Sequence, residues 1–376
     1  MNTPLTIALV STERKWQGGE EQAYQLARGL RARGHHVLAI GLAQRPWLDR
    51  MRRDRFETFP LTGKPPTPYR CWMLRRFLQR SRVDVVHFND AHALTLGGIA
   101  AWRLPGVARI AARRASFAIR SPARYRHLCD RVLCVSSYAA SLCRLAGVPE
   151  SHLRIVHDGV DPQRVAQGDR KRGRQTLALA PATPCILAIG SLAPSKGHRF
   201  LIEAVPRLVA KRPDLCVAIA GEGPLHEQLQ QLARRLGVEP VVRLLGFRTD
   251  IPDLIHACDL FVFPSIQEGL GSTLIDVMLA ERPIVTTTSG GIPDLVFDQN
   301  ERPLAHTVPA GRADELAVAI ADVLDHRTQY LPRTRRARQH ALARFTVDSM
   351  VEHTLRCYHE VLNEKKHDTE TLPAAG

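Results

Sequence analysis

The sequence predicts an α/β protein of two domains, each built on a parallel β-sheet. The chain has 376 residues, more than one hydrophobic core usually fills. Strand-like apolar segments alternate with helix-like segments over residues 5–156, and the alternation restarts over 184–287. The strand-like segments are largely apolar, as in parallel strands covered on both faces, and in the second half glycines are concentrated where the strands end. Sheets of this kind bind ligands at the carboxyl ends of their strands.

The first half opens with a strand at 5–10, followed by a helix that starts at Gly18 and Gly19 and stops at Gly34. The motif G-x-G-x-x-G of nicotinamide and flavin sites is absent here, and the two glycines could also serve only to let the chain turn. Further strands are predicted at 36–40, 83–88, 108–112, 131–135 and 153–156. The candidate ligand contacts at the ends of these strands are Asp90, His92, Arg113 and Arg114.

The first half is also strongly basic. Residues 1–165 contain 27 lysines and arginines against 12 acidic residues, whereas the remainder contains 25 of each. From 45 to 82, basic residues are interleaved with apolar ones, which suits an anionic membrane surface, nucleic acid, or a solvated basic face whose aromatic residues serve the core. We favour the membrane and expect no nucleic acid, because no base-reading module is recognisable. The interleaved residues are Arg45, Arg50, Arg52, Arg53, Arg55, Lys64, Arg70, Arg75, Arg76, Arg80 and Arg82, with Trp47, Met51, Phe56, Trp72, Met73, Leu74 and Phe77.

The second half repeats the strand–loop–helix pattern. Strands are predicted at 184–189, 215–220, 241–245, 259–263 and 283–287, and helices at 312–326 and 333–362. Residues 169–174 have the composition of an exposed connector. The predicted domains are therefore 1–165 and 166–345, followed by a helix at 346–364 and a flexible tail at 365–376.

One stretch of the second half, residues 263–280, carries most of the chemistry. A strand ends in Pro264, a loop with Gly269 and Gly271 follows, and an apolar helix comes next. Backbone amides beside glycines can contact an anion such as a diphosphate, while Glu268 and Asp276 can accept hydrogen bonds from hydroxyls. Lys196, at another helix start, is placed like a phosphate clamp. Together these groups indicate a nucleotide-sugar, although an ordinary turn with incidental acids has the same outline.

Several function classes lose support. The elements H-x-x-E-H, D-x-D, G-x-S-x-G and G-K-[ST] are absent, which disfavours zinc hydrolysis, metal-clamped sugar transfer, serine hydrolysis and P-loop hydrolysis. The eight cysteines are scattered, as expected in a reducing cytoplasm without a metal cluster or disulfide framework. No run approaches the roughly 18 apolar residues of a membrane span. The apolar N-terminus resembles a buried first strand more than a signal peptide.

The order of motifs resembles the family 4 retaining glycosyltransferases of the GT-B fold, over nearly the whole chain. This fold has two facing Rossmann-like domains, with a final helix that crosses back to the first. Here that helix contains Tyr358. The matching motifs are Gly18-Gly19-Glu20-Glu21, Asp84-Val-Val-His87, Val135-Ser136, His157-Asp-Gly-Val-Asp161, Gly190 to Lys196-Gly197, Gly221-Glu-Gly-Pro224, Glu268-Gly-Leu-Gly271 through Asp276-Val-Met-Leu-Ala280, and Gly290-Gly291-Ile-Pro-Asp294.

The resemblance implies roles for individual residues. Glu268 would contact the hydroxyls of the donor sugar, Asp276 those of the ribose, and Lys196 the diphosphate. The resemblance implies no metal and no cofactor beyond the nucleotide-diphosphate sugar, and retention of anomeric configuration. It places the first domain on the acceptor side and the second on the donor side. Backbone contacts to the donor are implied for Gly18, Gly19, Gly246, Phe247, Arg248, Gly269, Leu270 and Gly271.

Three positions depart from the family pattern. Asp276 is one methylene shorter than the usual glutamate. Ser191, predicted to lie in the donor site, replaces an arginine found in many relatives. Arg114 replaces a histidine near the reacting carbon and cannot act as a general base, so it is expected to hold a phosphate or the acceptor.

The sequence therefore predicts a cytoplasmic retaining glycosyltransferase, associated with the inner face of the membrane through its basic first domain. It would move a hexose or heptose to a hydroxyl of a glycolipid or polysaccharide precursor, foremost lipopolysaccharide core. Glu268, Lys196 and Arg114 are the expected catalytic groups, with Asp90, His92 and Arg113 on the acceptor side. The alternatives are a nucleotide-sugar epimerase of similar fold, which needs no acceptor, and a non-catalytic binding protein that uses the basic face.

Overall fold

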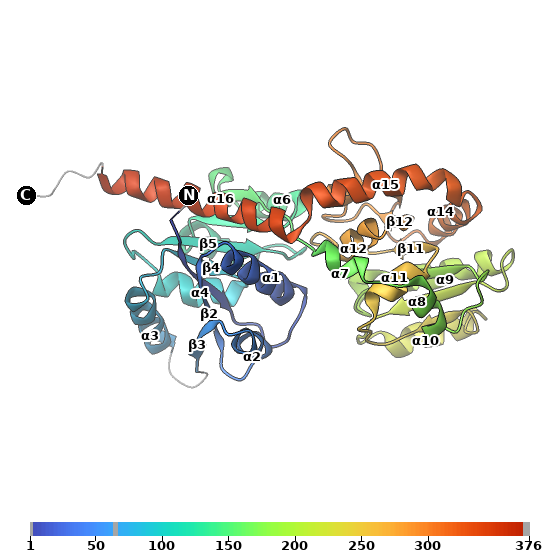
Figure 1. Cartoon of the computed structure of the whole chain (residues 1–376), viewed down its shortest axis with the longest axis horizontal. Helices are drawn as coiled ribbons and strands as arrows, with labels where there is room; N and C mark the ends of the chain where they lie inside the picture. The colour runs from blue at the N-terminus through green and yellow to red at the C-terminus, as the bar shows by residue number, and fades with distance from the viewer. Residues whose placement is uncertain (1–2, 63–66, 371–376) are drawn as a thin grey trace, which may run out of the picture. The chain divides into compact units, whose positions relative to one another are not determined.

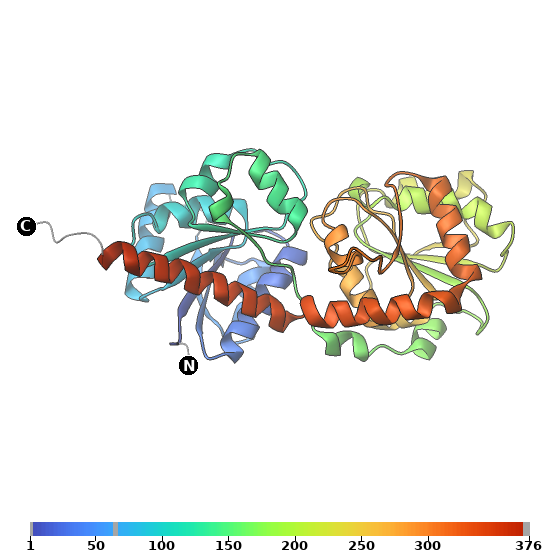
Figure 2. The same cartoon turned by 90° about the horizontal axis from the view of Figure 1, so that it is seen from above.

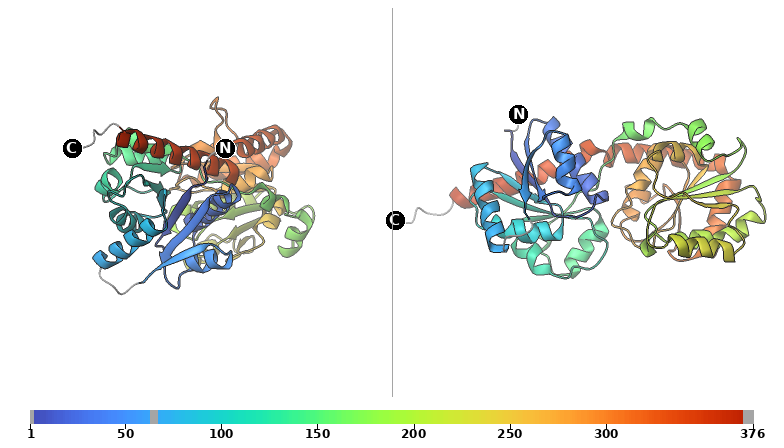
Figure 3. Two further views of the ribbon diagram at one scale, coloured as in Figure 1. Left: turned by 60° about the vertical axis from the view of Figure 1, so that its left-hand side comes forward. Right: turned by 90° about the horizontal axis from the view of Figure 1, so that it is seen from below.

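The computed structural model describes residues 3–62 and 67–370 (Figure 1). Lys64 of the basic segment lies outside the described residues. The chain forms two compact units: unit 1 consists of Met1–Gly159 and Val347–Gly376, and unit 2 of Val160–Thr346. Each unit is a parallel sheet with helices on both faces, so the predicted α/β class with two Rossmann-like domains is confirmed (Figure 3).

The sheet of unit 1 has seven strands in the order β3-β2-β1-β4-β5-β6-β7. The interior strand β1 pairs in parallel with both β2 and β4, so the strand order reverses between β1 and β4. β1 is continuously buried after Thr6, as its unbroken apolar sequence predicts. The strands are β1 (Thr6–Ser11), β2 (His36–Leu42), β3 (Glu57–Leu61), β4 (Val85–Phe88), β5 (Ala108–Arg113), β6 (Arg131–Cys134) and β7 (Leu153–Ile155).

The last helix of the chain belongs to unit 1. It runs along α1 and the sheet (Figure 2), and it contributes the fully buried Tyr358 and Val351 to the same core as Leu9 and Leu26. The helical elements of unit 1 are α1 (Gly18–Ala32), α2 (Pro46–Arg53), α3 (Thr67–Arg80), α4 (Ala91–Ala100), α5 (Pro122–His127), α6 (Ser137–Leu145), the 3-10 turn η1 (Glu150–His152) and α16 (Val347–Glu370).

The sheet of unit 2 repeats the same pattern in the order β10-β9-β8-β11-β12-β13, and it reverses between β8 and β11. Its strands are β8 (Cys185–Ile189), β9 (Cys216–Ala220), β10 (Val242–Leu244), β11 (Leu260–Phe263), β12 (Ile284–Thr287) and β13 (His306–Val308). Its helical elements are α7 (Pro162–Ala166), α8 (Arg170–Thr176), the 3-10 turn η2 (Pro194–Lys196), α9 (His198–Val209), α10 (His226–Arg235), α11 (Ile251–Ala257), α12 (Thr273–Leu279), α13 (Pro293–Val296), α14 (Ala313–Asp325) and α15 (Arg327–Arg344).

The C-terminal helical region differs from the prediction in two ways. The single helix expected at 333–362 is broken, because Phe345 is fully buried and its carbonyl accepts a hydrogen bond from Val160 N at 2.9 Å. α16 then extends to Glu370, beyond the predicted end at 364. Glu364 pairs with Arg131, and Lys365 Nζ lies 3.1 Å from an oxygen of Asp130. The division between the units falls at Gly159, before the predicted boundary at 165.

The predicted connector at 169–174 is also wrong. These residues form most of α8, and Asp169 caps that helix by accepting a hydrogen bond from Arg172 N at 2.6 Å. The side chain of Arg170 pairs with the buried carboxylate of Asp259 at 2.8 Å. Arg174 is itself buried and donates to the carbonyl of Thr183. This charged run is anchored to unit 2 by its ion pairs.

Strands β3 and β13 were not anticipated, because each is short and carries polar residues. In the basic segment, Trp47 and Met51 are buried in the core, as expected of a solvated face with core aromatics, but Trp72 on α3 is 53% exposed. None of the helices in the described residues is both long and apolar enough to cross a bilayer.

Candidate active site

Lys196 and Glu268 meet where the strand order of unit 2 reverses. Lys196 lies in the loop after β8 and Glu268 in the loop after β11, the two strands that flank this point. Lys196 Nζ is 2.5 Å from Glu268 Oε1, and Ser265 Oγ donates to the same oxygen at 2.9 Å. Glu268 is buried, and a quarter of the Lys196 side chain is exposed. One cation and one carboxylate are thus held side by side at the carboxyl edge of the sheet, as the sequence predicted for a ligand site.

The two loops are fixed to each other by their backbones. Ile266 N donates to the carbonyl of Ser195 at 2.8 Å. Gly197 has a positive φ of 65°, and a Cβ at this position would lie 2.0 Å from the carbonyl oxygen of Pro264. A side chain is therefore excluded where the loops touch, which explains the glycine after Lys196.

Asp276 lies in α12 and is paired with an arginine that the sequence did not indicate. Its Oδ2 accepts a hydrogen bond from the guanidinium of Arg164, on α7, at 2.7 Å. Burial raises the pKa of Asp276 to about 6, and Arg164 opposes this shift. Arg164 is half exposed, whereas only 7% of the Asp276 side chain is accessible. The shorter acid is therefore held below the surface and covered by a cation from another helix.

The other predicted donor contacts lie on loops at the same edge. Gly221 N, directly after β9, donates to the carbonyl of Gly246 at 2.8 Å, and Gly221 itself packs against the backbone of Gly190, directly after β8. Phe247 is 71% exposed, and Arg248 pairs with Asp250 at 2.6 Å. Ser191 is exposed, Leu270 is buried, and Gly269 and Gly271 follow Glu268 directly.

In unit 1, Asp90 has a structural task. It caps α4 by accepting hydrogen bonds from His92 N and Ala93 N. It also accepts from Thr12 N at 2.6 Å and Thr12 Oγ1 at 2.7 Å, which fixes the loop after β1. The side chain of His92 is exposed in the first turn of α4. Through these four hydrogen bonds, Asp90 fixes the loop after β1 to the start of α4.

Gly18 and Gly19 begin α1, as predicted, and the residue after them is a buried acid. Glu20 accepts a hydrogen bond from Ser11 Oγ at 3.3 Å and from Asn89 Nδ2 at 3.2 Å. Burial raises the pKa of this carboxyl. Glu20 therefore ties the helix start to the ends of β1 and β4, and the sequence motif alone did not reveal this role.

Arg113 and Arg114 point to different partners. Arg113 is buried, and its guanidinium donates to the carbonyl of Phe117. Arg114 donates to Asn89 Oδ1 at 2.5 Å and to Asp158 Oδ1 at 3.0 Å. Burial raises the pKa of Asp158, and the charge of Arg114 opposes that effect. Arg114 thus holds two polar side chains at the end of β4, and Asp158 is a second acid that the sequence did not single out.

His87, within β4, is a core residue. Its Nδ1 lies 2.6 Å from the hydroxyl of Tyr358 on α16, and burial lowers the pKa of the imidazole to about 3. A histidine with this pKa is neutral near pH 7 and fully enclosed. It joins α16 to the sheet and does not face a ligand site.

The fold and these groups define a two-domain α/β protein with a lysine and a carboxylate paired where the strand order of one sheet reverses. Residues 16–164 match the family described as glycosyltransferase family 4, and residues 183–326 match the family described as glycosyl transferases group 1. The chain belongs to the group 1 glycosyltransferases.

Three similar proteins illustrate the family. A GDP-mannose-dependent alpha-(1-6)-phosphatidylinositol monomannoside mannosyltransferase of Mycolicibacterium smegmatis is 30% identical over 82% of this chain and 79% of its own. D-inositol 3-phosphate glycosyltransferase 2 of Catenulispora acidiphila is 32% identical over 52% of this chain, and the match spans about half (48%) of that relative. The crystal structure of Anabaena HepE in complex with UDP is similar in fold, with a TM-score of 0.82 and 23% identity over 95% of this chain and 100% of that one.

Proposed function

We propose that the chain is a metal-independent, retaining glycosyltransferase that uses a nucleotide-diphosphate sugar and no cofactor. The observation that carries this proposal is the pairing of Lys196 with Glu268 at 2.5 Å, at the switch point of unit 2. A lysine suits a diphosphate, and a carboxylate suits the hydroxyls of a sugar. The two groups that such a donor needs therefore stand together in one place.

Each group has a distinct task in transfer. Lys196 offsets the negative charge that builds on the diphosphate as the bond to the sugar breaks. Glu268 accepts hydrogen bonds from the sugar hydroxyls and orients the anomeric carbon. Asp276, held by Arg164, accepts hydrogen bonds from the hydroxyls of the ribose. The segments 269–271 and 246–248 contribute backbone contacts to the phosphates and the base.

We propose an anionic glycolipid as the acceptor. The excess of basic residues over 1–165 favours a negatively charged partner. Relatives carry names that point to inositol phosphate and to a phosphatidylinositol mannoside as substrates, both of which contain phosphate. Lipopolysaccharide core belongs to the same chemical class and remains within the proposal, with a hexose or heptose as the transferred sugar.

We further propose a cytoplasmic location with peripheral association at the inner face of the membrane. Tyr69 and Trp72 on α3 are 50% and 53% exposed, and their rings stack 5.7 Å apart with Arg76 beside Trp72. Exposed aromatic and basic side chains suit an anionic interface. Association with anionic vesicles should weaken steeply as salt is raised, and absence of association at low salt would contradict this proposal.

Donor binding is tested by thermal unfolding with UDP, GDP and their sugars. A ligand at 100 times its dissociation constant stabilises the native protein by about 2.7 kcal/mol. Lys196→Gln should lose most of this stabilisation. The matched control Lys171→Gln, an exposed lysine of α8, should keep it. No stabilisation by any nucleotide would contradict the proposed function.

Product analysis tests the remaining parts. The anomeric proton of the product should show the configuration of the donor, and a chelator should leave the rate unchanged. An epimerase would instead interconvert the donor sugar in the absence of any acceptor. Inversion of the anomeric configuration would contradict the proposed retaining mechanism. Loss of activity on addition of the chelator would contradict the proposed independence from metal.

A further inference from the structure

Unit 1 contains a cleft of about 800 Å³ at the carboxyl ends of β1, β2 and β3. Its walls come from the loop after β1, the ends of β2 and β3, the first turn of α3, and one side of α4. The volume suffices for a sugar or a lipid headgroup. Its lining includes Arg14, Lys15, Arg45, Arg70, Leu96 and Ile99.

The cleft is cationic, and its positive charges have no internal partners. Arg14, Lys15, Arg45 and Arg70 line it, against a single acid, Glu13. Within residues 3–62 and 67–370, the side chains of these four cations form no ion pair and no hydrogen bond. Other arginines of unit 1 do find partners: Arg109, for example, pairs with Asp130 at 2.6 Å. A concave site with several unpaired cations attracts an anion.

The side chain of Arg70 is a second observation that points to an anionic ligand, because one of its N–H groups lacks a hydrogen-bond acceptor within the described part of the chain. Its Nε is buried yet has no hydrogen-bond acceptor among the described residues, although the residue as a whole is only half buried. Buried N–H groups are normally satisfied, and a buried N–H without an acceptor is unfavourable. An oxygen of a bound phosphate would satisfy this donor, and arginine binds phosphate with a favourable geometry.

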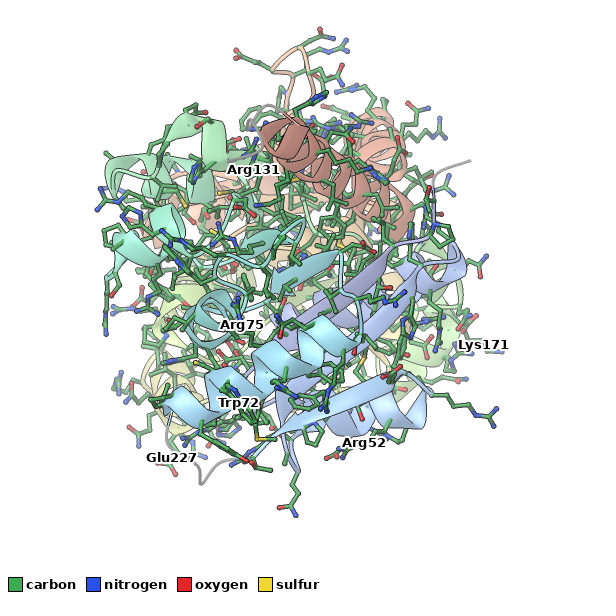
Figure 4. All side chains as sticks on the ribbon, turned by 90° about the vertical axis from the view of Figure 1, so that its left-hand side faces the viewer. Arg52, Trp72, Arg75, Arg131, Lys171 and Glu227 are labelled. Carbon is green, nitrogen blue, oxygen red and sulfur yellow. The ribbon has the colours of Figure 1, made fainter. Side chains whose placement is uncertain are left out.

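The uncharged part of the lining is mixed: it has a polar set and an apolar set, the apolar set being Leu42, Ala43, Leu61, Leu96 and Ile99. Leu61 and Leu96 are buried, and Ile99 is 46% exposed. The exposed aromatic pair Tyr69 and Trp72 lies on the same helix, α3, whose first turn lines the cleft, and Figure 4 shows Trp72 and Arg75 along that helix. The apolar residues beside the four cations suit a ligand that has a hydrophobic part as well as an anionic group.

The cleft adjoins the proposed acceptor side of the active site. Thr12, which lines it, is held by Asp90 at the point where the strand order of unit 1 reverses. The loop that carries Arg14 and Lys15 leads directly to Gly18, the first residue of α1. A ligand in the cleft would therefore extend toward the strand ends at which these enzymes receive substrates.

We propose that this cleft binds the phosphate ester group of the acceptor, with Arg70, Arg14, Lys15 and Arg45 as its ligands. This proposal rests on the proposed glycosyltransferase function and narrows its acceptor to phosphate-bearing molecules. The shared chemistry is a phosphate ester, carried either by a soluble sugar phosphate or by a lipid headgroup.

Binding of two probes tests the proposal. The soluble probe is inositol 3-phosphate, and the lipid probe is a phosphatidylcholine vesicle with or without phosphatidylinositol. Measurements are made on Lys196→Gln protein, so that the lysine of the proposed donor site cannot account for phosphate binding. Arg70→Gln, and separately the exposed pair Arg14→Gln with Lys15→Gln, should weaken binding of the effective probe at least tenfold.

The matched control is Arg80→Gln. It removes the same charge from the same helix, but Arg80 lies outside the cleft, so affinity should change less than twofold. If the soluble probe binds, a free phosphate ester is sufficient for binding in the cleft. If only the vesicles with phosphatidylinositol bind, the ligand of the cleft is a lipid headgroup. If neither probe binds, or if the cleft variants bind as well as Arg80→Gln, the proposal is overturned.

The outcome is separable from that of the proposed function. Nucleotide binding is measured in parallel on protein with Lys196 intact. Failure of the probes with normal nucleotide binding removes only the phosphate subsite. If no nucleotide binds but a probe binds in a way that depends on Arg70, only the assignment of the donor site is contradicted.

Discussion

The two sheets of this protein have the same strand order but use their switch points differently. In unit 1, the acids near the reversal serve the protein itself: Glu20 ties α1 to the sheet, Asp90 caps α4, and Asp158 is paired with Arg114. In unit 2, Lys196 and Glu268 meet on loops at the sheet edge. The same framework thus carries, in unit 1, cations that have no ion pair among the described residues and, in unit 2, a cation paired with an acid.

Each unit also contains a buried aspartate that is paired with an arginine. Asp158 and Asp276 both have a pKa raised by burial, and each is held by one arginine. The environments of the arginines differ: 19% of the Arg114 side chain is exposed, against 51% of the Arg164 side chain. Water can therefore partly replace Arg164 but not Arg114, and the two pairs should respond unequally to the same mutation.

The largest expected effect concerns the chemistry of unit 2. Glu268→Ala should lower the transfer rate by roughly 100-fold or more, because the hydroxyls of the donor sugar lose their acceptor and Lys196 loses its partner. Initial rates with a nucleotide-sugar and a glycolipid acceptor provide the measurement. Glu227→Ala, an exposed glutamate of α10, is the matched control. Full activity in the Glu268 variant would remove the site from unit 2.

The second effect concerns the enclosed pair of unit 1. Arg114→Ala should cost about 3–5 kcal/mol of unfolding free energy, because Asp158 is left buried without its cation and Asn89 loses a donor. All four tryptophans lie in unit 1, so urea unfolding followed by tryptophan fluorescence reports on this unit. A loss below about 1 kcal/mol would show that water compensates Asp158.

The third effect is a pH dependence in unit 2. The pKa of Asp276 in the folded protein is about 6, above the ordinary value of 3.8, so the native state holds this proton more tightly than the unfolded chain. Stability from this group is complete below pH 4 and is lost as the pH rises through 6, by an amount on the order of 3 kcal/mol. Asp276→Asn should remove this slope, measured by circular dichroism during urea unfolding. An unchanged slope in the variant would assign the pH dependence to other groups.

The smallest effect is expected from Arg164→Ala. This mutation should lower the free energy of unfolding by about 1 kcal/mol at pH 7. Half of the Arg164 side chain is already exposed to water, and Asp276 can take up a proton when the arginine is absent. In the Asp276→Asn background, the same mutation should cost less, and the difference measures the coupling of the pair. A loss as large as that of Arg114→Ala would abolish the contrast between the two units.

Much of the fold followed from local patterns. Continuous apolar runs marked most of the strands, and the glycine-bearing loops after β8 and β11 marked Lys196 and Glu268. β3 was missed because it is a short edge strand that begins with the polar residues Glu57 and Thr58 and contains Pro60. The arginine-rich run at 169–174 looked solvated, since composition does not show that Asp253 and Asp259 lie beneath it.

The sequence by itself determined the two Rossmann-like sheets and the loops that carry the acid and the lysine, because strand length, apolar continuity and glycine position are local properties. Only the tertiary structure decided which charges are paired. Arg164 and Asp276 are 112 positions apart, and Arg114 and Asp158 are 44 apart. A charged side chain has the same sequence signature whether a partner reaches it or not. The distinction between anchored arginines and the unpaired cations of the unit 1 cleft therefore exists only in the folded chain.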